Sequence, residues 1–194
     1  MSREIDEGLE RAERTRPIPV HLNTRVKFLW EKVAKEDTAK LAQAAGVSQR
    51  TAQRWTHALK ALAEGRMKGD IPMTKTNARK VEQAVRATWQ PGVRRRVRRD
   101  AEQRGFMLHI SATFGFSAAS GSTDDPRPRV ITQKMPGDVA RRLYAARDAG
   151  ASQAQQEALL AEALREHYFK DGGRRAAGLD VELNDISWMD LEGL

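Results

Sequence analysis

Cysteine is absent from this chain of 194 residues, so the sequence provides neither a disulfide framework nor thiol chemistry. Long apolar runs are also missing, because no stretch approaches the roughly 20 residues that a membrane-spanning helix needs. The first residues lack the cationic start and the apolar core of a secretion signal. With 40% hydrophobic and 31% charged residues, the composition predicts a globular protein of the cytoplasm that makes no membrane contact.

Residue patterns of catalytic and metal sites are scarce as well. The four histidines stand singly, without the spacing of metal ligands. No phosphate-binding loop and no dinucleotide fingerprint occurs. Asp124 and Asp125 have the chemistry to bind Mg²⁺, but two adjacent carboxylates in a turn usually only form the turn. We therefore expect a protein that is not an enzyme, with no metal site and no cofactor of its own.

Positive charge is in excess, and it is placed unevenly. The net charge is +8. Residues 1–105 contain 24 Lys and Arg against 13 Asp and Glu, whereas residues 106–194 contain 10 against 13. A basic half attracts polyanions because phosphates release their condensed counterions. No basic segment has the Trp, Phe and Leu face of an interfacial helix, so nucleic acid is favoured over a membrane surface.

The period of the apolar residues changes near residue 105. Before it, apolar residues recur at helical spacing, as in the run from Val26 to Val33. After Gly105, residues 106–116 alternate and are rich in β-forming types, which predicts a strand. Residues 117–129 have the Ser, Gly, Asp and Pro composition of an exposed loop.

We predict three parts for this α+β chain. Residues 1–22 form a mobile N-terminal arm, because Pro17 and Pro19 interrupt a short polar helix. Residues 23–105 form an all-helical DNA-binding domain. Residues 106–194 form a small α+β domain with about three strands and two helices, which contains the exposed loop.

The strongest local pattern is a helix-turn-helix at residues 38–57. Leu41 and Trp55 have the spacing of a helix-pair core, Gly46 permits a sharp turn, and Ser48 caps the second helix. Exposed positions at the start of that helix carry amide, guanidinium and hydroxyl groups that suit base edges and phosphates. The predicted DNA-contacting set is Ser48, Gln49, Arg50, Thr51, Gln53 and Arg54. An ordinary helical hairpin with a glycine turn is the alternative.

A second basic segment lies in the last predicted helix before residue 105. Its arginines occupy most faces of a short helix, so they either grip a phosphate backbone or form a solvated surface. The residues concerned are Arg94, Arg95, Arg96, Arg98 and Arg99.

Several short stretches, in order along the chain, resemble the telomere-protecting terminal proteins of actinomycete linear chromosomes and linear plasmids. The stretches are TRPIP at 15–19, GVSQRT at 46–51, WQP at 89–91, FGF at 114–116, AGAS at 149–152, DGGRRA at 171–176, VE at 181–182 and DI at 185–186. They cover nearly the whole chain and match best in its C-terminal half. Residues 20–40 and 56–80 match poorly.

The resemblance implies a protein primer that stays covalently attached to the 5′ ends of a linear replicon. In this family a side-chain hydroxyl accepts the first deoxynucleotide from a DNA polymerase, whose Mg²⁺ ions serve the transfer. The implied partners are telomeric DNA, both duplex and single-stranded 3′ overhang, a telomere-associated recruiting protein and the polymerase. The implied location is the nucleoid, at DNA ends.

The resemblance also assigns the acceptor residue. The family's acceptor threonine lies in a Gly-[Thr/Ser]-Thr-Asp turn, which is the segment 121–124 of this chain. Thr123 therefore takes the role, with Ser122 as the fallback and Ser120 and Ser117 as nearby candidates. An exposed loop suits an acceptor that must reach the active site of another protein.

The alternative function is a transcriptional regulator, with the same helix-turn-helix and a C-terminal domain for dimerisation or ligand binding. A regulator is released from DNA by salt or detergent, whereas a terminal protein stays until protease removes it.

Overall fold

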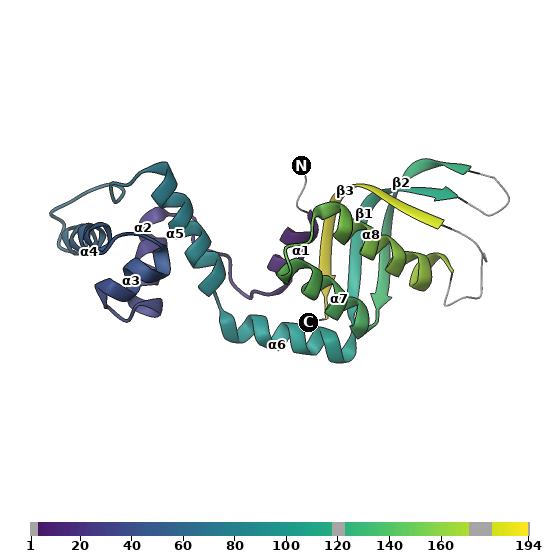
Figure 1. The fold of residues 1–194 in the computed structure, drawn as a ribbon, viewed down its shortest axis with the longest axis horizontal. Helices are drawn as coiled ribbons and strands as arrows, with labels where there is room; N and C mark the ends of the chain where they lie inside the picture. The colour runs from purple at the N-terminus through teal and green to yellow at the C-terminus, as the bar shows by residue number, and fades with distance from the viewer. Residues whose placement is uncertain (1–3, 118–122, 171–179, 194) are drawn as a thin grey trace. The chain divides into compact units, whose positions relative to one another are not determined.

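The computed structural model describes residues 4–117, 123–170 and 180–193. Over these residues the chain is a mixed α+β protein with eight α-helices and a three-stranded antiparallel sheet (Figure 1). It divides into two compact units: residues 16–91, called the helical unit, and residues 1–15 with 92–194, called the sheet unit. No helix in the described ranges combines the length and the apolar character needed to span a membrane.

The helical unit is built from short helices around one core. Its elements are α2 (Leu22–Phe28), the π-helical turn η1 (Leu29–Val33), α3 (Thr38–Ala45), α4 (Gln49–Ala63) and α5 (Lys75–Thr88). The predicted helix from Val26 to Val33 is therefore α2 continued directly by a π-helical turn. One side of each element supplies the core, which includes Val26, Leu29, Leu41, Trp55, Val81 and Val85.

The sheet unit contains one antiparallel sheet in the order β2-β1-β3. The strands are β1 (Phe106–Ser117), β2 (Thr123–Met135) and β3 (Asp180–Glu192). Ile110 in the central strand lies opposite Ile131 of β2 and Met189 of β3, and all three side chains are buried. The alternation predicted for this strand is confirmed from residue 106 to residue 114, where the even-numbered positions are buried and residues 107, 109, 111 and 113 are half-buried.

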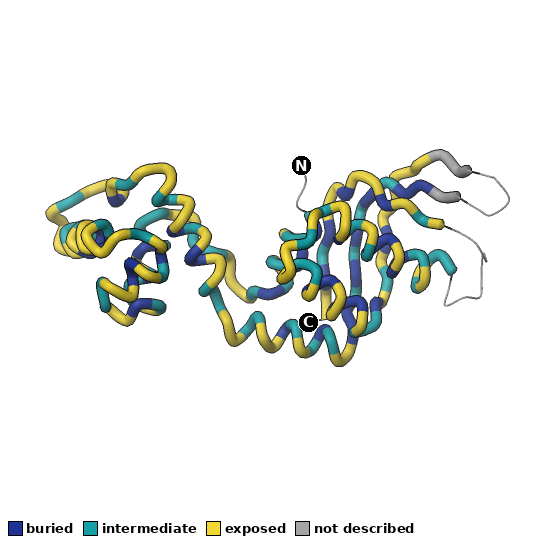
Figure 2. Tube along the Cα trace, viewed as in Figure 1, coloured by how far each residue is buried: buried dark blue, intermediate teal, exposed yellow. Residues whose placement is uncertain are grey.

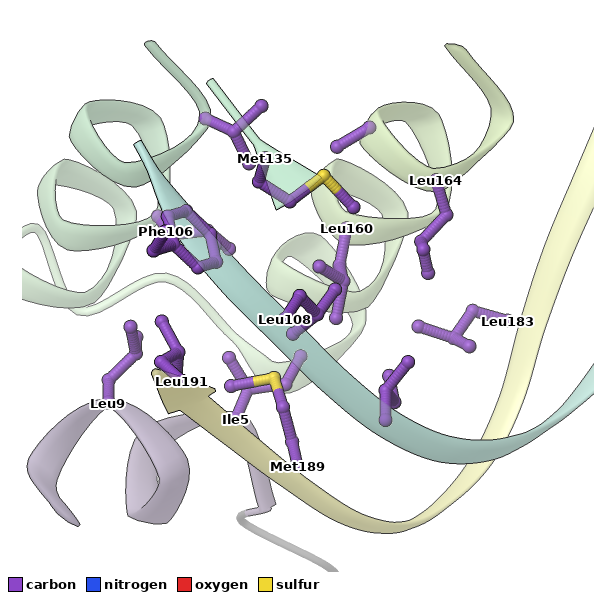
Figure 3. Packing of buried hydrophobic residues seen from close by; sticks show 14 of the residues in the cluster. Ile5, Leu9, Phe106, Leu108, Met135, Leu160, Leu164, Leu183, Met189 and Leu191 are labelled. Atoms are coloured by element: carbon purple, nitrogen blue, oxygen red, sulfur yellow. The ribbon is translucent and has the colours of Figure 1, made fainter. Parts of the chain in front are cut away.

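Helices cover the buried face of this sheet. They are α7 (Gly137–Asp148) and α8 (Gln153–Leu164), which η2 (Arg165–Phe169) extends, while α6 (Pro91–Arg104) contributes Ala101 to the same core. Leu160 and Leu164 of α8 lie over the strands beside Leu108 and Leu183 (Figure 3). Ser152 begins α8 with a reciprocal capping box, so local sequence fixes where this helix starts.

The predicted mobile arm at residues 1–22 is corrected by the structure. Residues Glu4–Ala12 form helix α1, and its Ile5 and Leu9 are buried against Met189 and Leu191 of β3 (Figure 3). The two apolar residues stand one helical turn apart, so they form a small continuous face. This small apolar face is sufficient to pack α1 against β3, although most other residues of the helix are polar.

Glycine makes this docking possible at one position. A Cβ atom on Gly8 would lie 2.9 Å from the Cε of Met189 and 3.0 Å from its carbonyl oxygen. The guanidinium of Arg11 donates to the same carbonyl at 2.8 Å, which satisfies an acceptor on the outer edge of β3. The sequence did not reveal this contact, because its partners are about 180 residues apart.

The predicted domain boundary at residue 105 also shifts. Helix α6 was expected in the DNA-binding domain 23–105, but from Gly92 onward it belongs to the sheet unit. Its Val97 and Ala101 are buried, and Ala101 joins the same core as Phe106. The apolar stripe was read correctly, but periodicity cannot say which core a helix faces.

The predicted loop at residues 117–129 is largely strand. β2 begins at Thr123, and Arg127 and Pro128 pair with Phe114 and Thr113 of β1. The composition of this segment, which includes Pro126 and Pro128, had predicted a loop. β2 is an edge strand, however, where the missing N–H of proline can face solvent. The part of the predicted loop at residues 118–122 lies outside the described residues.

The third strand departs from strict alternation. Apolar and polar residues alternate over residues 179–184 of the sequence, but the buried positions of β3 are Leu183, Ile186, Met189 and Leu191. The register against β1 shifts twice in this region, and Asp185 adopts a φ of +50°. These β-bulges change which face each residue occupies, which single-strand periodicity does not reveal.

Candidate nucleic-acid interface

The start of α3 is fixed by a side-chain cap. The carboxylate of Asp37 accepts hydrogen bonds from the backbone N–H of Ala39 at 2.8 Å and of Lys40 at 3.1 Å. The hydrogen bond from Lys40, followed by that from Ala39, holds the pKa of Asp37 below its ordinary value despite some desolvation. Asp37 therefore caps α3 as a carboxylate at neutral pH.

The turn between α3 and α4 consists of residues 46–48. Gly46 has a φ of +60° and a ψ of 39°, in the left-handed region, and open space surrounds it, so conformation rather than crowding requires glycine. The N–H of Val47 donates to the carbonyl of Ala42 at 3.0 Å, which closes the end of α3. Ser48 then begins α4 by accepting the N–H of Thr51 at 3.3 Å.

The inner faces of α3 and α4 pack on the core as the sequence predicted. Leu41 and Ala45 of α3 are buried, and so are Ala52 and Trp55 of α4. Trp55 is only 1% exposed, so its indole is a central contact of the helical unit. This packing fixes the rotation of α4 about its own axis, and therefore decides which of its residues reach solvent.

The outer face of α4 carries the predicted base-reading residues. All four are exposed: Gln49, Arg50, Gln53 and Arg54. Figure 2 shows how exposed, intermediate and buried residues are distributed along each helix. They form two pairs spaced four residues apart, so they share one side of the first two helical turns. Neither Arg50 nor Arg54 forms an ion pair with any described residue. The structure therefore leaves both guanidinium groups available to an outside partner.

The two predicted phosphate-binding hydroxyls lie at the start of the same helix. Ser48 Oγ and Thr51 Oγ1 are 2.9 Å apart and hydrogen-bond to each other. Only one of the two O–H groups can donate in this pair, and the other has no acceptor among the described residues. The pair therefore serves the helix cap and still leaves one donor for a phosphate oxygen.

Sequence reasoning did not single out Lys80, which the structure places beside the turn. Its Nζ donates to the carbonyl of Gly46 at 2.8 Å. Lys75 and Arg79 are exposed on the same helix, α5, which begins at the cap residue Thr74. The spacing of Lys75, Arg79 and Lys80 places three cations near the start of one helix, and this signal was present in the sequence. No apolar pattern, however, indicated that α5 lies beside the turn.

The arginine-rich helix α6 contains two kinds of side chain. Arg94 and Arg98 point inward to Glu13, which is only 3% exposed. Arg98 also forms a bidentate pair with Asp148, at 2.5 and 3.1 Å. An internal carboxylate network therefore holds Arg94 and Arg98, in contrast to the other arginines of the predicted DNA-contacting set on this helix.

The remaining arginines of α6 face solvent. They are Arg95, Arg96 and Arg99. Arg99 lies 3.7 Å from the carboxylate of its neighbour Asp100, while Arg95 and Arg96 form no ion pair with the described residues. The arginine cluster is thus divided between two faces of α6, and contact of the exposed arginines with a phosphate backbone stays a prediction.

A buried tyrosine completes the network on α6 and α7. The guanidinium groups of Arg98 and Arg147 lie 4.9 and 5.3 Å from the ring centre of Tyr144. Arg147 also contacts Glu13 at 2.8 Å. Burial, followed by the nearby Glu13 charge, raises the pKa of the Tyr144 hydroxyl to about 12.

Charge is concentrated in one of the two units. The helical unit contains 15 Lys and Arg against 6 Asp and Glu, a net charge of +9. The sheet unit contains 19 against 20, a net charge of −1. The net positive charge of the chain therefore lies in the unit that contains α3 and α4. The charge difference between the two units has the same direction as the difference between residues 1–105 and 106–194 in the sequence.

The predicted acceptor residues lie around the β1–β2 hairpin. Thr123 is the first residue of β2, and its backbone pairs with Ser117, the last residue of β1. Ser120 and Ser122 lie outside the described residues. Thr123 is thus at the base of the hairpin connection rather than inside a long loop.

Within the described ranges no three His, Asp or Glu side chains come together as a group able to hold a metal ion. Comparison of the chain with known protein families, with curated proteins and with solved structures finds no match. The functional assignment therefore depends on the residues and their geometry.

Proposed function

We propose that this chain is a terminal protein that binds telomeric DNA and primes its synthesis. In this proposal α3 and α4 form a helix-turn-helix, with α4 as the helix that enters the major groove. The sheet unit carries the hydroxyl that accepts the first nucleotide. The observation that carries the DNA-binding part is the exposed, unpaired face of Arg50 and Arg54 at the start of α4.

Three features support DNA binding by α4. The buried Trp55 holds the helix so that Gln49, Arg50, Gln53 and Arg54 point outward. Their amide and guanidinium groups match the donors and acceptors of base edges in the major groove. The helical unit carries a net charge of +9, which favours a polyanion over a neutral partner.

The priming part of the proposal derives from the family resemblance and concerns Thr123. The side-chain oxygen would attack the α-phosphorus of a deoxynucleoside triphosphate, forming a phosphodiester bond while pyrophosphate leaves. The hydroxyl proton passes to a base of the polymerase or to water, and the new 3′-OH continues synthesis. The Mg²⁺ ions of the polymerase supply the electrostatic stabilisation of this transfer. Protein priming solves the end problem, since the recessed 5′ end opposite the 3′ overhang offers no upstream 3′-OH from which a polymerase could fill the gap.

Arginine substitution on α4 tests the DNA-binding part. Arg50→Ala removes one exposed guanidinium, and a good base contact is worth about 1–3 kcal/mol. We expect at least several-fold weaker binding of a telomeric duplex in a fluorescence anisotropy titration, with an unchanged unfolding temperature. Lys60→Ala is the matched control, because Lys60 is exposed on the same helix and carries the same charge. Equal affinities of both variants and the parent protein would overturn the assignment of α4.

Peptide mapping tests the acceptor. In a priming reaction with labelled nucleotide and cell extract, we expect mass spectrometry to find the nucleotide on Thr123. Thr123→Ala should abolish the transfer and leave DNA binding intact, while Thr123→Ser should retain part of it. A nucleotide on Ser122, Ser120 or Ser117 would contradict the residue assignment but keep the protein primer. No label on any residue would favour a transcriptional regulator.

A further inference from the structure

The helical unit contains a groove beside an aromatic pair. The groove has a volume of about 690 Å³ and is lined by Phe28, Val33, Ala87, Trp89 and Pro91, among others. The rings of Phe28 and Trp89 are 4.7 Å apart between centroids and tilted by 59°. The volume lies within the range of about 300–1,000 Å³ that small-molecule sites occupy.

Two hydrogen bonds across distant sequence build one wall of the groove. The indole N–H of Trp89 donates to the carbonyl of Arg16 at 3.0 Å. The backbone N–H of Arg16 in turn donates to the side-chain oxygen of Gln90 at 3.3 Å. Gln90 has a φ of +47°, so the chain turns sharply at the end of α5. Arg16 is thereby held beside the aromatic pair.

The polar groups of the groove are cationic or neutral. Arg16, Lys32, Thr88 and Gln90 line it, and no acidic residue is among its lining residues. Neither Arg16 nor Lys32 forms an ion pair with a described residue. The neighbouring cation Lys27, by contrast, lies 3.7 Å from Glu31. A site with aromatic walls and uncompensated positive charge fits a ligand that is both aromatic and anionic.

We propose that this groove binds a nucleotide of single-stranded DNA. The base stacks on the surface formed by Phe28 and Trp89, and the flanking phosphates lie near Arg16 and Lys32. Stacking on aromatic side chains next to a cationic path for the backbone is the usual physics of single-strand binding. Bases in a duplex are stacked on one another, so the groove selects a single strand.

This proposal deepens the function proposed above, on which its choice of DNA rests. The single-stranded site shares no residue with the exposed face of α4. The two sites can therefore be removed separately, and one protein can hold both the duplex and the overhang of a DNA end.

The test measures binding of a short labelled oligonucleotide, single-stranded or annealed into a duplex, by fluorescence anisotropy. Trp89→Ala removes the stacking surface, and base stacking of about 1–3 kcal/mol corresponds to a fivefold to more than hundredfold weaker single-strand binding. Trp188→Ala is the matched control, because Trp188 is an exposed tryptophan of the sheet unit, 42% accessible. Lys32→Gln leaves the aromatic packing in place and tests the groove if Trp89→Ala fails to fold.

We expect Trp89→Ala and Lys32→Gln to lose single-strand affinity and to keep duplex affinity. Single-strand affinities equal to those of the parent and of Trp188→Ala would overturn the proposal. Equal loss of single-strand and duplex binding would also overturn it, because the two sites would not be separate. Efficient competition by a free deoxynucleoside triphosphate would overturn the choice of a DNA strand as the ligand. Failure of the α4 assignment gives a different result, because duplex binding would then be unchanged in Arg50→Ala.

Discussion

Replacing Arg98 by alanine separates the structural arginines of α6 from those available to DNA. The substitution removes the bidentate pair with Asp148 and the hydrogen bond from Nε to Glu13. It also removes the cation that lies 4.9 Å from the ring centre of Tyr144. Glu13 still pairs with Arg147 at 2.8 Å, so the buried carboxylate loses one cationic partner but keeps another.

The expected cost follows from the burial of these groups. Breaking a fully buried pair costs about 3–5 kcal/mol. Arg98 is 24% exposed, and Asp148 is 54% exposed and screened by water, so the ionic part is smaller. With a cation–π contribution of about 0.5–1 kcal/mol, we expect a total loss of about 2–3 kcal/mol in the free energy of unfolding.

Arg95→Ala is the control, because Arg95 lies on the exposed side of the same helix and should cost less than about 0.5 kcal/mol. Urea unfolding followed by circular dichroism measures both variants. Equal unfolding midpoints for Arg98→Ala and the parent, or equal losses in the two variants, would refute the division of α6 into two faces.

Three further predictions concern other parts of the chain. Neutralising Arg95, Arg96 and Arg99 together should flatten the slope of log K against log salt for duplex DNA, by up to about 0.9 per lost phosphate contact, and an unchanged slope would mean a solvated face. The pKa of Tyr144 is raised to about 12, so its stabilisation is present below the unfolded pKa near 10 and is lost as pH rises through 12. As the pH rises from 10 to 12, the unfolding midpoint of the parent should therefore decrease more than that of Tyr144→Phe. Identical pH profiles of the two proteins would contradict this. Gly8→Val should cost about 1–3 kcal/mol in thermal or urea unfolding by displacing α1 from β3, and a variant as stable as the parent would refute the close contact.

Local chemistry explains what the sequence predicted well. Asp37, Gly46, Ser48 and Ser152 each begin or end a helix through contacts within a few residues, and Gly46 and Ser48 were predicted in these roles. The outward position of Arg50 followed from the same spacing that buries its apolar neighbours.

Long-range contacts explain what the sequence missed. The docking of α1 depends on Gly8 meeting β3, and the inward turn of Arg98 depends on Glu13, about 85 residues away. The groove beside Trp89 likewise needs Arg16 from the far end of the unit. Residues 123–129 were predicted as a loop because they contain two prolines. Prolines are compatible with an edge strand, but the sequence does not show that this segment lies at the edge of the sheet.

The most direct test of the proposed function is the state of DNA ends in cells that make this protein. Total DNA is boiled in detergent, purified without protease and probed with an antibody against the chain. We predict that the polypeptide stays on the terminal fragments, that protease releases it, and that Thr123→Ala in the only gene copy prevents the attachment. Terminal fragments free of the polypeptide after detergent would contradict a covalent terminal protein and would favour a transcriptional regulator.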